Sequence, residues 1–273
     1  MGDFMQTFLD KIIATKKLEV AERSIAVPIA QLKEEIFQQG PPRNFFQAVT
    51  REPGGKPCNL IAEVKKASPS AGIIREDFDP VAIAKVYQQN GADALSVLTD
   101  EKYFMGSLEY LRQVRAAVHL PVLRKDFIID PYQVYEARAA GADAILLIAE
   151  CLATNEMIDL QILATEMRMT VLIEVHDMDN FIRVRDSVIG FPHRSYSLLG
   201  INNRDLRTFK TDLGTTLRMT ELVADPTVLI SESGIHTRAH IDKLVAAGVR
   251  AVLIGESLMR SEDIGAKMQE LFG

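Results

Sequence analysis

The chain has 273 residues, 47% of them hydrophobic and 25% charged, which is enough apolar material for a large core. Its formal net charge of -6, with no long basic tract, argues against a nucleic-acid partner. The apolar run at 144–149 is too short to cross a membrane, and the charged first residues do not resemble a signal peptide. The two cysteines, Cys58 and Cys151, are too few for a disulfide framework, so we expect a cytoplasmic protein without membrane attachment.

Residues 1–50 precede the first expected strand and have helical patterns. The apolar residues of the first helix share one face: Phe4, Phe8, Ile12 and Ile13. A second helix begins after Pro28, and Asn44 is suited to cap a short third helix. Because an apolar helical face needs a partner, we expect residues 1–50 to form a helical extension that covers one end of the main domain.

From about residue 60 onward, short apolar runs alternate with helical patterns. The runs have the continuous apolar character of parallel strands buried on both faces, at 60–65, 94–98, 122–125, 144–148, 171–175, 198–202, 228–231 and 251–254. Helices are expected at 80–89, 108–118, 131–140, 155–167, 178–188, 213–223, 236–247 and 263–271. Eight such strand–helix units predict a single α/β domain, a closed (β/α)8 barrel of the TIM type. A doubly wound open sheet is the weaker alternative, because no Gly-x-Gly-x-x-Gly motif follows any run.

Polar residues collect at the carboxyl ends of these runs, where the active sites of such barrels lie. Glu63 and Lys65 are two apart on a strand and share a face, and burying them is costly unless they are paired or functional. By the same alternation, Lys125 lies over the barrel mouth and Arg124 faces the other side. One charged pair at a strand end is ordinary, but many charges on one rim favour a site. The further rim residues are Thr99, Asp100, Asp126, Glu150, Glu174, Asn202, Asn203, Arg204 and Glu232.

Two glycine-containing segments, Ser233-Gly234 and Gly255-Glu256, follow the last two expected strands. Glycine lets backbone N–H groups approach an anion, and the N-terminus of a following helix adds a favourable dipole, so these segments predict a phosphate site. The Glu256 carboxylate is awkward beside a phosphate, and we expect it to turn outward. The alternative is that both glycines only form tight turns.

Other candidate chemistry is weaker. His236 and His240 have the spacing of a shared metal site, but their helix is expected on the outside of the barrel, where a solvated pair is favoured. Neither cysteine has a convincing catalytic partner in the sequence. No cluster of carboxylates and histidines demands a metal, and we predict none.

Residues 63–70, Glu-Val-Lys-Lys-Ala-Ser-Pro-Ser, resemble the first-strand motif of indole-3-glycerol phosphate synthase. Further segments resemble the same family in the same order, at 96–104 with 106–107, 123–128, 172–176, 200–206 and 231–235. The resemblance implies a (β/α)8 barrel with an N-terminal helical extension and a carboxy-lyase of tryptophan biosynthesis. That enzyme closes the indole ring of 1-(2-carboxyphenylamino)-1-deoxyribulose 5-phosphate, releases carbon dioxide and water, and uses no cofactor.

The resemblance also implies roles for single residues. Lys125 is similar to the general acid that protonates the substrate carbonyl, Glu174 to a second acid/base group, and Lys65, with Glu63 as its partner, to a lysine near the substrate carboxylate and phosphate. The residues that resemble substrate-orienting groups are Ser68, Asn202, Arg204, Glu232 and Ser233. Those that resemble phosphate-binding groups are Lys65, Gly234, Gly255 and Glu256. Association with other tryptophan-pathway enzymes is a further partner that the resemblance allows.

Two rival interpretations stay open at this point. Another phosphate-sugar barrel enzyme, such as phosphoribosylanthranilate isomerase, would need a cysteine or aspartate acid/base pair at its strand ends, which the set of Lys65, Lys125 and Glu174 fits poorly. A non-catalytic barrel that binds a phosphorylated ligand would keep the phosphate segments but would not need both lysines and both glutamates.

Overall fold

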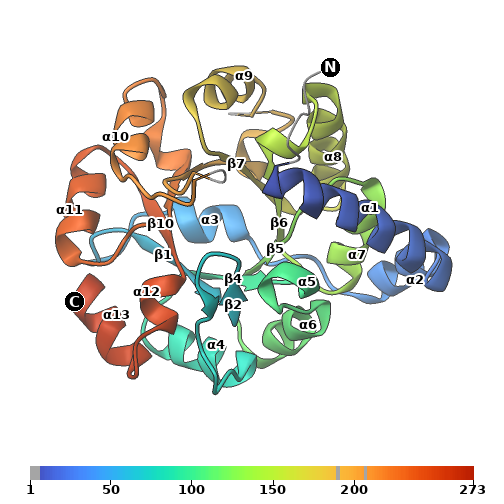
Figure 1. Cartoon of the computed structure of the whole chain (residues 1–273), viewed down its shortest axis with the longest axis horizontal. Helices are drawn as coiled ribbons and strands as arrows, with labels where there is room; N and C mark the ends of the chain where they lie inside the picture. Colours follow the sequence, from blue (N-terminus) through green and yellow to red (C-terminus); the bar gives the residue numbers. More distant parts are fainter. Residues whose placement is uncertain (1–6, 189–190, 206–207) are drawn as a thin grey trace.

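The computed structural model of the chain describes residues 7–188, 191–205 and 208–273. Its centre is a closed barrel of eight parallel strands, in which each strand pairs with the next along the chain and the last pairs with the first. Helices surround the barrel in a ring (Figure 1). The predicted (β/α)8 class is therefore confirmed. The barrel strands are β1 (Asn59–Val64), β4 (Ala94–Leu98), β5 (Val122–Lys125), β6 (Ala144–Ile148), β7 (Thr170–Val175), β8 (Ser197–Asn202), β9 (Leu229–Glu232) and β10 (Ala251–Ile254).

The outer helices follow the strands in chain order. They are α4 (Pro80–Gln89), α6 (Leu108–Ala117), α7 (Pro131–Ala139), α8 (Thr154–Glu166), α9 (Met178–Val188), α10 (Gly214–Thr220), α11 (Arg238–Ala246) and α13 (Ile264–Phe272). Short elements that the sequence patterns did not predict lie in the connections: the hairpin β2 (Ala67–Ser68) with β3 (Gly72–Ile73), the helices α5 (Glu101–Phe104) and α12 (Glu256–Met259), and the 3-10 turns η1 (Ala149–Cys151), η2 (Arg194–Tyr196) and η3 (Pro226–Val228). No helix in the described part of the chain is both long and apolar enough to cross a membrane.

All eight barrel strands begin and end within one residue of the expected positions, and β9 shows what causes a shift of one residue. The expected run began at Val228, whereas β9 begins at Leu229 and extends to Glu232. The start moves because Pro226–Val228 form the turn η3, which the Asp225 side chain caps by accepting from the backbone N–H of Thr227 at 3.1 Å.

Alternation along the strands separates two cores. Residues such as Leu123 and Leu172 point into the barrel, while Val171 and Ile173 pack against the outer helices. A side chain two residues beyond an inward one also points inward, so Leu172 places Glu174 inside the barrel. The same alternation therefore determines which polar side chains point into the barrel at the carboxyl ends of the strands.

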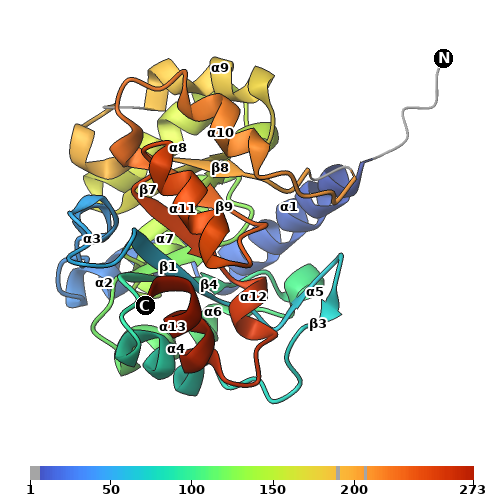
Figure 2. The same cartoon turned by 90° about the vertical axis from the view of Figure 1, so that its left-hand side faces the viewer.

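The N-terminal extension reaches both ends of the barrel rather than the one end that we expected. Helix α1 (Phe8–Ala26) lies across the carboxyl ends of the strands and α3 (Phe45–Thr50) lies at the opposite end, as Figure 2 shows. Helix α2 (Ile29–Gln38) connects them along the side of the barrel, where Leu32 packs with Tyr132 and Ala139 of α7. Phe4 lies outside the described residues.

A buried lysine fastens α1 to the barrel. Lys16 is 1% exposed, and its Nζ lies 2.7 Å from Asp100 Oδ2 and 3.0 Å from Asp126 Oδ1. Burial alone would lower the pKa of Lys16, but the charges of Asp126 and Asp100 raise it above its ordinary value. Asp126 also pairs with Arg124, and although burial opposes it, the two cations hold the pKa of Asp126 well below its usual range. The amine is therefore charged and paired with two buried carboxylates.

We predict that Lys16→Met lowers the free energy of unfolding by about 3–5 kcal/mol, because it leaves the two carboxylates buried with one cation fewer. Chemical denaturation measures this loss. Lys17→Met is the matched control, since Lys17 is exposed on the same helix and its loss should change stability by less than about 0.5 kcal/mol. Equal effects of the two substitutions would contradict the prediction.

Candidate active site

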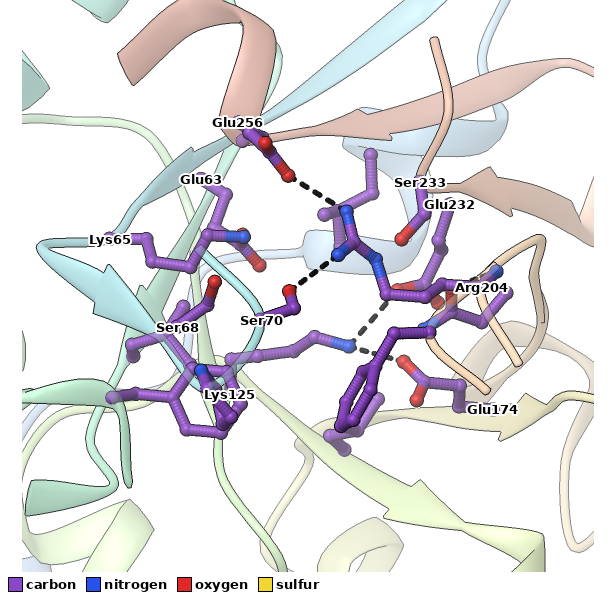
Figure 3. Close-up of a pocket in the computed structure, with 18 of the residues that line it drawn as sticks. Glu63, Lys65, Ser68, Ser70, Lys125, Glu174, Arg204, Glu232, Ser233 and Glu256 are labelled. Atoms are coloured by element: carbon purple, nitrogen blue, oxygen red, sulfur yellow. Dashed lines mark hydrogen bonds and ion pairs between the residues drawn. The ribbon is translucent and has the colours of Figure 1, made fainter. Parts of the chain in front are cut away.

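One pocket at the carboxyl ends of the strands brings together all the predicted site residues. Figure 3 shows the charged members pointing toward one another from different strands and loops. The predicted residues that line the pocket are Glu63, Lys65, Ser68, Lys125, Glu174, Asn202, Arg204, Glu232, Ser233, Gly234, Gly255 and Glu256. The structure therefore joins residues that are far apart in the sequence, while their roles stay predictions.

Lys125 occupies the centre of the charged cluster. Its Nζ contacts Glu174 and lies 3.0 Å from Glu232 Oε2. Burial alone would lower the pKa of Lys125, but the carboxylates of Glu174 and Glu232 raise it well above its ordinary value. Gly200 on β8 leaves space for the Glu232 side chain, because a Cβ at this position would collide with it. Lys125 is thus a charged donor held between two acceptors.

The two carboxyls beside Lys125 differ in proton affinity. Burial would raise the pKa of Glu174, but Lys125 and then His176 hold it well below its usual range. For Glu232, burial and the charge of Glu174 outweigh Lys125 and raise the pKa to about 8. Neighbouring carboxyls that differ in this way can act as base and acid at the same pH. Among the described residues, Glu232 Oε1 is buried without a hydrogen-bond partner, which leaves that atom available to a substrate.

A second lysine–glutamate pair, Glu63 and Lys65, lies on β1 and at its end, and the two side chains are in contact. The side chain of Glu63 lies against Gly255, where any Cβ would collide with its carboxylate. Ser68, on the following hairpin, has a buried hydroxyl that lacks a partner within the described part of the chain. These groups form the opposite wall of the pocket from Glu174 (Figure 3).

Arg204 bridges two loops over the pocket. Its guanidinium donates to Ser70 Oγ at 2.7 Å and to Glu256 Oε2 at 2.7 Å. The backbone N–H of Arg204 donates to Asn202 Oδ1 at 3.0 Å, which fixes the turn after β8. The expectation that Glu256 turns outward was wrong, because Arg204, together with Arg260, attracts its carboxylate to the rim of the pocket.

The predicted phosphate corner has the backbone shape of an anion site. Ser233 and Gly234 both have positive φ, at 66° and 75°, in the turn that follows β9. His240 Nδ1 lies 3.1 Å from the carbonyl oxygen of Gly234, so this histidine contacts the turn. In the described ranges, no group of His, Cys, Asp or Glu side chains is arranged to hold a metal ion.

Apolar side chains form the remaining wall, and sequence reasoning identified few of them. Phe8, Leu9 and Ile12 come from α1, and Phe104 and Phe127 come from the connections after β4 and β5. Phe8 and Ile12 could be anticipated from the sequence, because they belong to the apolar face expected for the first helix. Phe104 and Phe127 lie within the segments that resemble the synthase, but nothing in their own pattern distinguished them from core residues. The wall suits an aromatic ring.

Some rim residues lie behind the pocket instead of in it. Arg124 is fully buried, and its Nη2 lies 2.7 Å from Glu136 Oε2 in the helix layer. Asn203 donates to the carbonyl oxygens of Glu232 and Ser233 at 2.9 and 3.1 Å, which shapes the turn after β9. Cys58 is buried in the core, and burial raises the pKa of its thiol to about 12. None of the described pocket-lining residues is a cysteine.

Sequence comparison with known proteins identifies one family. The family model described as indole-3-glycerol phosphate synthase matches residues 9–271. A protein of Rhodopirellula baltica named indole-3-glycerol phosphate synthase is 47% identical over 258 residues, which cover 94% of this chain and 96% of the relative.

Solved structures with low sequence identity share the fold. A mutant tryptophan synthase alpha-subunit from Pyrococcus furiosus is 14% identical, with a TM-score of 0.58, and the match covers 80% of this chain and 98% of that one. A thiamine phosphate pyrophosphorylase from Pyrococcus furiosus is 15% identical, with a TM-score of 0.57, over 79% and 94%. The match to the family model and the relative in Rhodopirellula baltica go further than fold: the chain belongs to the indole-3-glycerol phosphate synthase family.

Proposed function

We propose that the pocket at the barrel mouth carries out the reaction of this family, with Lys125 as the general acid of ring closure. As a member of the family, the chain is a carboxy-lyase of tryptophan biosynthesis that acts on a phosphorylated small molecule, 1-(2-carboxyphenylamino)-1-deoxyribulose 5-phosphate. The observation that carries the proposal is the position of Lys125, a charged amine held between Glu174 and Glu232 at the centre of the pocket.

The pocket offers a separate partner for each part of the substrate. The apolar wall with Phe8 and Phe127 suits the aromatic ring. The turn at Gly234 and the backbone at Gly255 suit the phosphate, while Lys65 and Arg204 supply positive charge for anionic groups. Ser68, Asn202, Glu232 and Ser233 supply hydroxyl, amide and carboxyl groups that orient the sugar chain.

Ring closure needs an acid at the ketone. The aromatic carbon that bears the carboxylate forms a bond to the ketone carbon, and the electron pair of the carbonyl moves to oxygen. Lys125 donates the proton that turns this oxygen into a hydroxyl group, which avoids a free alkoxide in the pocket. Glu174 then carries a negative charge that the ammonium no longer balances.

Two further steps complete the reaction. Carbon dioxide leaves, and its bonding electrons restore the aromatic ring. The new hydroxyl then leaves as water after it receives a proton, while a base removes a hydrogen from the neighbouring CH2 group. We assign the acid and the base of this dehydration to two groups: Lys65, with Glu63 as its partner, and Glu174. They face the pocket from opposite walls.

The direct test is to incubate the purified protein with 1-(2-carboxyphenylamino)-1-deoxyribulose 5-phosphate and follow indole fluorescence. Formation of the indole product supports the proposal. A phosphoribosylanthranilate isomerase would instead form this compound from its own substrate, and a non-catalytic barrel would bind it unchanged. Either result would overturn the proposal.

We further infer a cytoplasmic location, supported by the two unpaired cysteines, Cys58 and Cys151. Association with other enzymes of the tryptophan pathway stays a prediction, and co-purification of the tagged chain from cells is the measurement that would test it.

We predict that Lys125→Arg lowers kcat by about 10²–10⁴, because arginine keeps the charge but cannot release a proton at neutral pH. KM should change little, since the charge that attracts the substrate is retained. Steady-state kinetics measures both constants. Near wild-type turnover in Lys125→Arg would mean that Lys125 only anchors charge. Arg124→Ala is the control, because Arg124 faces the helix layer and its loss should reduce stability more than turnover.

We predict that Gly234→Ala raises KM about tenfold or more, because a Cβ at φ 75° strains the turn and collides with the Thr211 side chain, which displaces the N–H groups proposed to bind phosphate. Gly248→Ala is the matched control. Its φ is also positive, at 92°, but it lies in the turn between α11 and β10, away from the pocket. Both variants should lose stability, and only Gly234→Ala should lose substrate affinity. An unchanged KM for Gly234→Ala would show that the phosphate site is misplaced.

We predict that Glu256→Gln strengthens competitive inhibition by inorganic phosphate about threefold to tenfold, because it removes a negative charge from the proposed phosphate corner and frees Arg204. Inhibition constants at low and high ionic strength measure the effect, which should shrink as salt screens the charge. Inhibition equal to that of the wild type would place the phosphate elsewhere.

A further inference from the structure

We infer that Glu150 and His176 form a positioning pair that holds the Glu174 carboxylate in place for the reaction. The two residues lie directly behind Glu174 and do not line the pocket. Glu150 was noted as a rim residue, and His176 lies inside a segment that resembles the family, but neither was assigned a role from the sequence. The inference rests on the role proposed above for Glu174.

The contacts form a chain that begins outside the pocket and ends at Lys125. Glu150 Oε1 accepts from the backbone N–H of His176 at 3.0 Å, and Glu150 Oε2 lies 3.1 Å from His176 Nδ1. The other ring nitrogen, Nε2, lies 3.1 Å from Glu174 Oε1. Glu174 then directs its second oxygen, Oε2, to Lys125. Each oxygen of Glu174 therefore has one cationic neighbour, which restricts the rotation of the carboxylate.

The surroundings keep the imidazole ring protonated. The His176 side chain is 5% exposed, and the charged groups that face it are Glu150 from η1 and Glu174 from β7. Burial alone would lower the pKa of His176, but the two carboxylates raise it to about 10. Cys151 lies near the same carboxylates, and burial with their charge raises the pKa of its thiol, so it stays neutral. Arg183 of α9 directs its guanidinium to the carbonyl oxygens of Ala149 and Leu152 and to the Thr154 hydroxyl.

The pair serves two purposes in the proposed reaction. The imidazolium favours the ionised form of Glu174, which must accept a proton, and its charge attracts Oε1 while Oε2 contacts Lys125. It also supplies a positive charge between two acidic groups, Glu150 and Glu174. When Lys125 gives up its proton, His176 remains as the cation beside Glu174.

The test compares His176→Asn and Glu150→Gln with the wild type, measuring kcat and KM from pH 3 to 9, a range that includes the titration of Glu174. Both variants should lower kcat by about tenfold or more and leave KM within about twofold, because neither residue touches the substrate. In His176→Asn the acidic limb of the kcat profile should move to higher pH by about one unit, since Glu174 loses its cationic neighbour. In Glu150→Gln the imidazole is still protonated at acidic pH, so this limb should stay in place. His119→Asn is the matched control, because His119 is exposed at the opposite end of β5 and its loss should change none of these quantities.

Two further measurements keep the test decisive if His176→Asn folds poorly. The ring of His176 should remain protonated at pH 8 in the wild-type NMR spectrum and should titrate at lower pH in Glu150→Gln. A pKa raised from 6.5 to about 10 stabilises the folded state fully below pH 6.5, and this contribution is lost as the pH rises toward 10. The stability difference between the wild type and His176→Asn should therefore shrink over that interval.

Wild-type kcat in both variants, an unshifted acidic limb in His176→Asn, or a His176 ring that titrates near 6.5 in the wild type would overturn the inference. Glu174→Gln separates this failure from failure of the proposed function. If Glu174→Gln loses activity and the two positioning variants do not, Glu174 acts without the pair. If Glu174→Gln is fully active, the role of Glu174 itself is wrong and the inference falls with it.

Discussion

Buried charge at the mouth of the barrel is the constraint on which the rest of this structure depends. Glu174, Glu232 and Asp126 are all nearly inaccessible to solvent, and a buried carboxylate is tolerated only when it is paired or protonated. Each meets the condition differently: Glu174 lies between Lys125 and His176, Asp126 lies between Arg124 and Lys16, and Glu232 has a raised pKa. The loops and the N-terminal helix are arranged around these pairings.

Two adjacent residues on β5 show how one strand serves both stability and chemistry. Arg124 points outward, where a guanidinium that never releases its proton joins Asp126 and Glu136 in a permanent network. Lys125 points inward, where an amine that can release its proton meets Glu174 and Glu232. Because side chains alternate along a strand, the outward network also fixes the position of β5 along the barrel axis and hence the position of Lys125. The stabilising residue and the reactive residue are thus coupled through one backbone.

Much of the fold and of the site could be predicted from the sequence, because both follow from short-range patterns. The apolar runs identified every barrel strand, and alternation placed Lys125 inward and Arg124 outward before any contact was known. What escaped prediction depends on contacts between segments distant in sequence. The direction of the Glu256 side chain depends on Arg204, the burial of Lys16 depends on Asp100 and Asp126, and the ring of His176 is held by Glu150. No local pattern around Glu256, Lys16 or His176 contains those partners.

The attachment of α1 through Lys16 also has a consequence for how the molecule is made. Lys16 leaves the ribosome well before Asp100 and Asp126, so only Glu19 of its three carboxylate partners is present while the first strands are synthesised. A contact between residues so distant in sequence requires a large loop to close, which costs conformational entropy. Phe8, Leu9 and Ile12 arrive at the pocket on the same helix, so the apolar wall is assembled only when that loop has closed. Helix α1 is therefore synthesised before the loops to which Lys16 attaches it, and the pocket gains its apolar wall only when α1 has docked on them.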